Sequence, residues 1–207
     1  ILIQKIIDGY KASPPFYTLS FIDSLKLQRI SAEKWVKDKF PLKNIFASIT
    51  KRKKEKKIRV GYYSSDFYNH PVSFSLAYLL ELHDKSKFEL IGFSFGPEKN
   101  DEMRKRVSST FNQFINANLK NDKEVVQLSR DLNIDIAVDL TGFTSNNRFG
   151  IFIERCAPIQ VNFLGYHGTL GSNHHDYIIA DKILIPKENQ KDYSEKIVYL
   201  PNSFLVN

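Results

Sequence analysis

Short runs rich in β-branched and aromatic residues alternate with helical stretches along most of this chain, from residue 58 onward. Two strands joined by a helix lie parallel, because the helix returns the chain to the same end of the sheet. Such crossover connections are right-handed. The alternation therefore predicts an α/β fold, a Rossmann-like parallel sheet with helices on both faces. The expected strands are residues 58–64, 88–95, 113–116, 134–140, 159–163 and 177–180, and the expected helices are residues 72–83, 101–109, 122–132 and 148–155.

The residues before this alternation follow a different pattern. Apolar side chains recur at helical spacing in residues 1–10 and 15–40, which predicts two or three helices packed as an appendage. We expect a helical appendage and linker in residues 1–50, a basic linker in residues 51–57, and the Rossmann-like lobe in residues 58–207. The chain starts with Ile instead of Met, which indicates a piece of a longer polypeptide.

The net charge of +7 comes mostly from one segment. Residues 51–57 hold six positive side chains and one negative, so six minus one leaves +5 of the +7 there. Such a run is typical of a solvated linker, and the two alternatives, contact with an anionic membrane or with nucleic acid, lack a supporting motif. We therefore expect no nucleic-acid partner.

Composition also bears on the compartment. No apolar run reaches the roughly 18 residues that a membrane span requires, and the first residues lack the regions of a signal peptide. Cys156 is the single cysteine, so no disulfide can form within the chain, which fits a reducing compartment, although a surface protein without disulfides would look the same. The prediction is a cytoplasmic protein without a membrane span.

Three polar loops each follow a predicted strand: residues 65–70, residues 139–144 and residues 164–171. Parallel strands place their carboxyl ends at one edge of the sheet, where open α/β folds bind ligands. The first loop ends in His70 and Pro71, and proline is favoured at the first helical position, so His70 is expected at a helix start. Two interpretations of His70 stay open, a helix cap and a catalytic residue. The third loop is rich in glycine, and its amides can approach a phosphate.

Five segments of the chain form an ordered set: RVGYYSSDFYNHPVS, VDLTGFTSNNR, RCAPIQVNFLGYHGTLG, DYIIADKILIP and YSEKIVYLP. The set resembles, in the same order, the N-terminal catalytic lobe of the O-linked N-acetylglucosamine transferase family, which includes the SPINDLY-type proteins and many bacterial relatives with tetratricopeptide repeats. The resemblance covers residues 58–204. Residues 15–40 resemble the helical segment before that lobe, so residues 1–50 are expected to follow preceding repeats.

The resemblance implies a GT-B fold, in which two Rossmann-like lobes face a cleft, with this chain as the first lobe. It implies inverting, metal-independent transfer of a sugar, with N-acetylglucosamine expected, from a UDP-sugar to a Ser or Thr hydroxyl of a protein or peptide. No cofactor is expected besides this donor substrate. His70 matches the family's histidine proposed as general base or as the residue that orients the substrate. The expected substrate- and donor-binding residues are Asp66, Asn69, Asp139, Thr144, Leu164, Gly165, Tyr166 and His167.

A metal site is not expected. The histidines at 167, 174 and 175 and Asp176 have the residue types of metal ligands but lack the i, i+4 spacing of a helical zinc site and a thiolate partner. No two aspartates are separated by a single residue, so the Asp-x-Asp metal clamp of many sugar-nucleotide transferases is absent from the sequence. A departing diphosphate would have to be neutralised by backbone amides, helix dipoles and side-chain cations.

Departures from the family pattern leave alternatives open. His167 replaces the usual proline, Leu170 replaces a small residue, and Phe74 stands where some members carry a second histidine. A glucosyl or fucosyl transferase of the same architecture, or one that modifies asparagine, is therefore an alternative, and so is a binding or scaffold module that has lost catalysis. The donor-binding lobe of the family lies outside these 207 residues. Because a GT-B enzyme needs both walls of its cleft, we expect this chain alone to be inactive.

Overall fold

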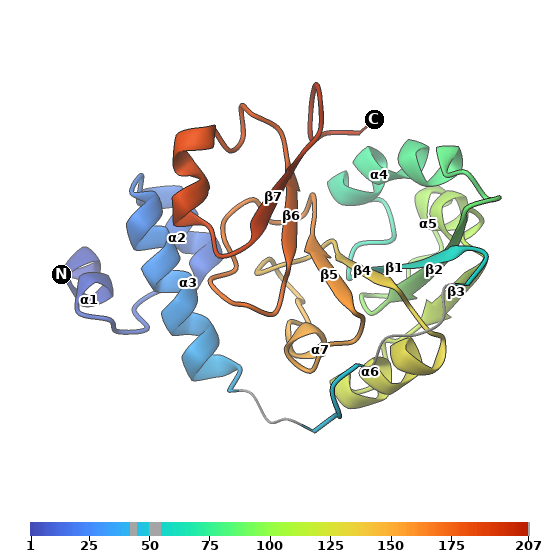
Figure 1. Cartoon of the computed structure of the whole chain (residues 1–207), viewed down its shortest axis with the longest axis horizontal. Helices are drawn as coiled ribbons and strands as arrows, with labels where there is room; N and C mark the ends of the chain where they lie inside the picture. The colour runs from blue at the N-terminus through green and yellow to red at the C-terminus, as the bar shows by residue number, and fades with distance from the viewer. Residues whose placement is uncertain (42–44, 50–54, 207) are drawn as a thin grey trace.

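The computed structural model describes residues 1–41, 45–49 and 55–206, and its centre is one parallel sheet (Figure 1). The sheet has seven strands in the order β3-β2-β1-β4-β5-β6-β7, and every neighbouring pair is parallel. This confirms the predicted Rossmann-like α/β fold. The strands are β1 (Ile58–Ser64), β2 (Phe88–Ser94), β3 (Gln113–Asn116), β4 (Ile136–Asp139), β5 (Ile159–Asn162), β6 (Tyr177–Ala180) and β7 (Lys196–Tyr199).

Helices cover both faces of the sheet (Figure 1). One face carries α4 (Pro71–Leu82) and α5 (Glu102–Ser108), and the other carries α6 (Asp122–Asp131) and α7 (Gly150–Ile153). Alternate side chains of β1 point to opposite faces, so Tyr62 packs with α4 and α5, while Tyr63 packs with α6 and α7. The short 3₁₀ helix η1 (Lys187–Asp192) precedes β7.

The first 40 residues form α1 (Leu2–Ile7), α2 (Pro15–Phe21) and α3 (Leu25–Lys39). Buried residues of α3 form a third core with the loops that follow β4 and β5. Gly171 permits this packing, because its φ is +60° and a Cβ there would lie 2.5 Å from the backbone nitrogen of Glu33. The helices therefore rest directly on the loop after β5.

The predicted basic linker, residues 51–57, falls largely outside the described residues. Within the part of the chain that the structure describes, no helix combines the length and the apolar character needed to cross a membrane.

Candidate functional site

The three polar loops meet at the carboxyl edge of the sheet and surround a pocket of about 400 Å³, which we call the rim pocket. They follow β1, β4 and β5, which are neighbours in the sheet, and the first turn of α4 closes one side. The pocket is lined by Phe16, Asp66, His70, Pro71, Val72, Ser75, Thr144, Ser145, Leu164, Gly165, His167 and Leu205. The carboxyl edge of the sheet thus brings together segments that are far apart in the sequence.

His70 is the N-cap of α4. Its Nδ1 accepts a hydrogen bond from the backbone N–H of Val72 at 3.3 Å, and Pro71 occupies the first helical position. Because Nδ1 is the acceptor, a neutral His70 in this arrangement carries its proton on Nε2. The other ring nitrogen is therefore a hydrogen-bond donor in the neutral ring.

The first loop also holds Asp66, which is only 7% exposed. Burial raises the pKa of its carboxyl group above the usual value, and the nearby His70 opposes this shift. The loop is closed onto α4, since the Ser73 hydroxyl donates to the backbone carbonyl of Asp66 at 2.6 Å. The amino end of α4 faces the same pocket, so its partial positive charge favours an oxygen that carries or develops negative charge there.

Asp139, at the end of β4, holds the backbone of the second loop through buried hydrogen bonds. Its side chain is 2% exposed; Oδ1 accepts from the backbone N–H groups of Thr141 and Gly142 at 2.9 and 3.0 Å. Oδ2 lies 3.2 Å from Nε2 of the buried His175. These bonds shape the turn that carries Thr144 to the pocket, so Asp139 acts on the backbone and does not line the rim pocket.

The third loop approaches the sheet closely. Leu164 adopts a left-handed backbone with φ of +69°, and a Cβ on Gly165 would lie 1.9 Å from the carbonyl oxygen of Leu140. Only glycine fits at 165 without displacing the chain. Tyr166 turns inward, where its ring packs against Phe143 with ring centroids 5.4 Å apart.

His167 comes back to the pocket. Its ring packs edge-on against Phe204 with centroids 4.8 Å apart, and its backbone carbonyl accepts from the hydroxyl of Tyr193. Burial lowers the pKa of His167, so the neutral ring is favoured. The pocket therefore contains two histidines, which reach it from different loops.

Six of the nine predicted site residues line the rim pocket: Asp66, His70, Thr144, Leu164, Gly165 and His167. The other three lie elsewhere. Asp139 and Tyr166 are buried beneath the loops, and Asn69 is exposed, with its backbone N–H donating to Asp101.

Sequence reasoning missed six residues that line the pocket: Phe16, Pro71, Val72, Ser75, Ser145 and Leu205. Ser75 carried a usable signal, since it lies one helical turn after Pro71. Phe16 and Leu205 carried none, because tertiary packing brings them to the pocket from distant segments.

The His and Asp side chains that have the chemistry of metal ligands do not converge on one point. His167 lines the rim pocket, His175 is buried behind Asp139, and Asp176 pairs with Arg155 at 2.9 Å. Across residues 1–41, 45–49 and 55–206, no group of three or more His, Cys, Asp or Glu side chains could hold a metal ion.

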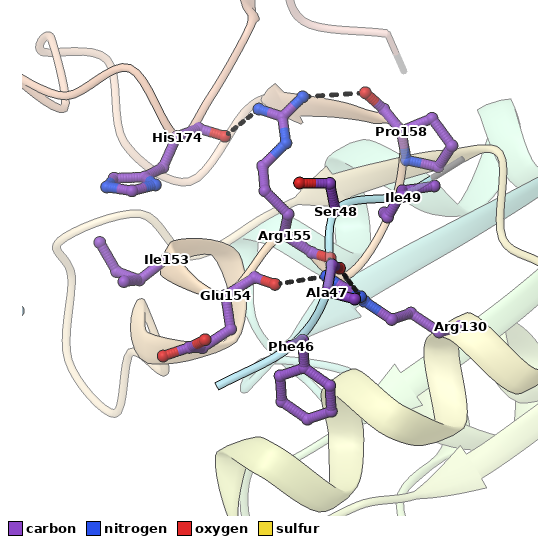
Figure 2. Close-up of a pocket in the computed structure, with 10 residues that line it drawn as sticks. All are labelled: Phe46, Ala47, Ser48, Ile49, Arg130, Ile153, Glu154, Arg155, Pro158 and His174. Atoms are coloured by element: carbon purple, nitrogen blue, oxygen red, sulfur yellow. Dashed lines mark hydrogen bonds between the residues drawn. The ribbon is translucent and has the colours of Figure 1, made fainter. Parts of the chain in front are cut away.

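A second hollow, of about 410 Å³, lies at the opposite edge of the sheet (Figure 2). Its two arginines are engaged by the protein itself. Arg130 donates to the backbone carbonyls of Glu154 and Arg155, and also to that of Ala47. Arg155 donates to the carbonyl of Pro158, just before β5. These bonds tie residues 46–49 to the end of α7, so the arginines here serve the architecture.

Comparison with known proteins matches residues 27–207 to the family described as glycosyl transferase family 41. A probable UDP-N-acetylglucosamine–peptide N-acetylglucosaminyltransferase, SEC, of Arabidopsis thaliana is 33% identical over 152 residues, covering 73% of this chain and 16% of that protein. The enzyme of that class in Caenorhabditis elegans is 32% identical over 152 residues, covering 72% of this chain and 13% of its own length.

A solved structure of a mutant Thermobaculum terrenum O-GlcNAc transferase superposes with a TM-score of 0.84 and 27% identity, covering 98% of this chain and 41% of that one. The present chain thus spans about 13–16% of the length of these two curated relatives. The family model covers well over half of the chain, and the fold agrees with the solved relative. The chain belongs to glycosyl transferase family 41.

Proposed function

We propose that this chain is the acceptor-side lobe of an inverting, metal-independent protein O-glycosyltransferase. The whole protein would move N-acetylglucosamine from a UDP-sugar to a Ser or Thr hydroxyl of a protein or peptide, in the cytoplasm, with a second lobe holding the donor. The observation that carries the proposal is the rim pocket of a family 41 lobe, which gathers His70, Asp66 and Thr144 around one cavity. The relatives named above support the choice of donor and acceptor.

In this proposal His70 orients the acceptor hydroxyl. The ring's Nδ1 already accepts from the Val72 amide, so its Nε2–H donates to an oxygen in the pocket. For Nε2 to take the hydroxyl proton, the neutral ring would have to move its own proton to Nδ1 and lose that cap. The geometry therefore favours positioning by His70 over general-base catalysis by His70.

The amino end of α4 supplies the second element of the proposal. As the hydroxyl oxygen bonds to the anomeric carbon, the bond from that carbon to the diphosphate oxygen breaks and the diphosphate leaves with its electron pair. The hydroxyl proton passes through solvent to the departing diphosphate. Negative charge near the pocket is stabilised by the helix dipole and by backbone amides. We propose that no metal or cofactor takes part, since these groups supply the required positive potential.

The test is transfer from UDP-[³H]N-acetylglucosamine to Ser- and Thr-containing peptides by the whole protein that contains this chain. The expected product is the β-glycoside, identified by NMR, and EDTA is expected to leave the rate unchanged. UDP-glucose and a fucosyl nucleotide run in parallel would identify another donor sugar. Peptide binding without transfer from any donor would overturn the proposal in favour of a binding module.

The role of His70 is tested separately. His70→Ala should lower kcat/KM by about ten- to a hundredfold, the effect of losing one hydrogen bond to a reacting group. His70→Gln, whose amide can still donate, should recover part of this loss if His70 orients the substrate, and none if His70 is the base. His174→Ala is the matched control, because this histidine lies at the opposite hollow.

A further inference from the structure

Phe16 is the one residue lining the rim pocket that comes from the helices before β1, among the lining residues of the described chain. It stands near the start of α2, directly after Pro14 and Pro15, which set the entry into the helix. Its ring is 44% exposed, and its aromatic neighbour Tyr17 is also exposed. The ring thus presents apolar surface to the pocket that the fold itself does not cover.

The position of α2 is determined by buried contacts. The hydroxyl groups of Thr18 and Ser31 lie 3.2 Å apart and fully inside, which joins α2 to α3. Leu19 reaches the third loop so closely that a Cβ on Gly168 would lie 2.9 Å from its Cδ2. Phe16 is therefore held in register with the same loop that supplies Leu164 and His167 to the pocket.

The pocket has two kinds of wall. Asp66, His70 and Thr144 are polar, whereas Phe16 and Leu205 supply apolar surface beside Leu164. The hydroxyl groups of a sugar need hydrogen-bond partners, and an apolar wall gives them none. An apolar side chain of a peptide gains from burial against the same wall. The chemistry of this side of the pocket thus fits the acceptor better than the donor sugar.

We propose that Phe16 is a specificity-determining residue that packs against an apolar side chain within two residues of the acceptor hydroxyl. The proposal rests on the proposed function, because it assigns the rim pocket to a peptide acceptor. It makes the α2 helix a part of the acceptor site. An acceptor with a polar residue at that place loses the contact and is used less well.

The test compares two acceptor peptides that differ at one flanking position, Val or Ser, with the whole protein and its variants. The wild type should prefer the Val peptide about tenfold in kcat/KM. Phe16→Ala should raise the KM for the Val peptide about tenfold, leave the KM for the sugar nucleotide unchanged, and abolish the preference. Phe16→Leu should restore most of it. Tyr17→Ala, on the same helix and outside the pocket lining, is the matched control.

The outcomes separate the two proposals. If the wild type transfers the sugar and Phe16→Ala keeps the same peptide preference, the role of Phe16 is overturned and the proposed function stands. If Phe16→Ala instead raises the KM for the sugar nucleotide, Phe16 contacts the donor sugar and its proposed role toward the peptide is overturned. If the wild type transfers nothing, the proposed function fails, and NMR titration of the Val peptide into the ¹⁵N-labelled 207-residue chain decides the role of Phe16. Binding weakened by Phe16→Ala supports that role, and equal binding overturns it.

Discussion

The buried Asp139 side chain offers the sharpest test of how the second loop is built. Its carboxylate accepts two backbone N–H groups and faces the ring nitrogen of His175 at 3.2 Å. Both residues are 2% exposed, so no water can replace a lost partner without rearrangement. Removal of the carboxylate in Asp139→Ala should therefore destabilise the whole lobe as well as the loop.

The expected magnitude follows from these bonds. A hydrogen bond to a charged group contributes roughly 1.5–3 kcal/mol, and a buried donor left without a partner costs roughly 1–3 kcal/mol. Because the contributions are not additive, we expect about 4 kcal/mol for Asp139→Ala. For a chain of this size that corresponds to a fall in Tm of about 8–16 °C. Asp139→Asn keeps an oxygen for the two amides but places an amide N–H against His175 Nε2, and should cost about 1–2 kcal/mol.

Urea unfolding followed by far-UV circular dichroism measures both variants against wild type. The m-value should stay constant, so that the shift in midpoint reports stability. Asp131→Ala is the control, because the bond that this carboxylate accepts from Gln127 lies on the exposed surface, and its cost should stay below about 0.5 kcal/mol. If Asp139→Ala lowers the free energy of unfolding by less than about 1 kcal/mol, the assignment of Asp139 as the support of this loop is refuted.

Three further predictions concern reactivity, pH and packing. Burial raises the pKa of Cys156 to about 12, so the folded chain at pH 8 should leave a thiol reagent such as DTNB unreacted, and rapid stoichiometric labelling would contradict this. Burial lowers the pKa of His167 and of two other histidines below 6.5, so the unfolded chain binds more protons in acid. The stability that comes from keeping these histidines neutral is fully present above pH 6.5 and is lost as the pH falls toward their lowered pKa values. His167→Gln should therefore make the free energy of unfolding, measured with urea, fall less steeply with acidification, and an unchanged slope would exclude a contribution from His167. Gly165→Ala should cost at least about 2 kcal/mol in thermal unfolding, because its Cβ would meet the Leu140 carbonyl oxygen at 1.9 Å; a near-neutral variant would show that the loop can yield.

Local sequence patterns predicted most of the sheet. The six expected strands form with bounds within two residues, because a buried parallel strand needs a run of β-branched or aromatic residues. The seventh strand, β7, was not assigned. It lies at the edge of the sheet, and its four residues are half-buried or exposed in alternation, so its sequence lacks the continuous apolar run. Predicted helix 148–155 is shorter in the structure, where α7 covers Gly150–Ile153.

The candidate site shows a similar division. Loops that follow parallel strands must meet at one edge, which is why six of the predicted residues share a pocket. The direction of a side chain within a loop depends instead on what packs beneath it. Asp139 turns inward because its carboxylate accepts two backbone N–H groups and faces the ring of His175. Tyr166 turns inward because its ring packs against Phe143. The chain pattern contains no sign of either contact.

Residue patterns along the chain are enough to specify the parallel α/β lobe, the edge at which its polar loops gather, and the family to which its ordered motifs point. These features follow from residue types at short spacing, which set local conformation and strand order. Three features emerge only from the folded structure: which loop residues face the pocket, which nitrogen of His70 accepts the helix-cap hydrogen bond, and the approach of Phe16 to the site from α2. Those depend on contacts between segments that are far apart in the chain, and such contacts exist only after the helices have packed on the loops.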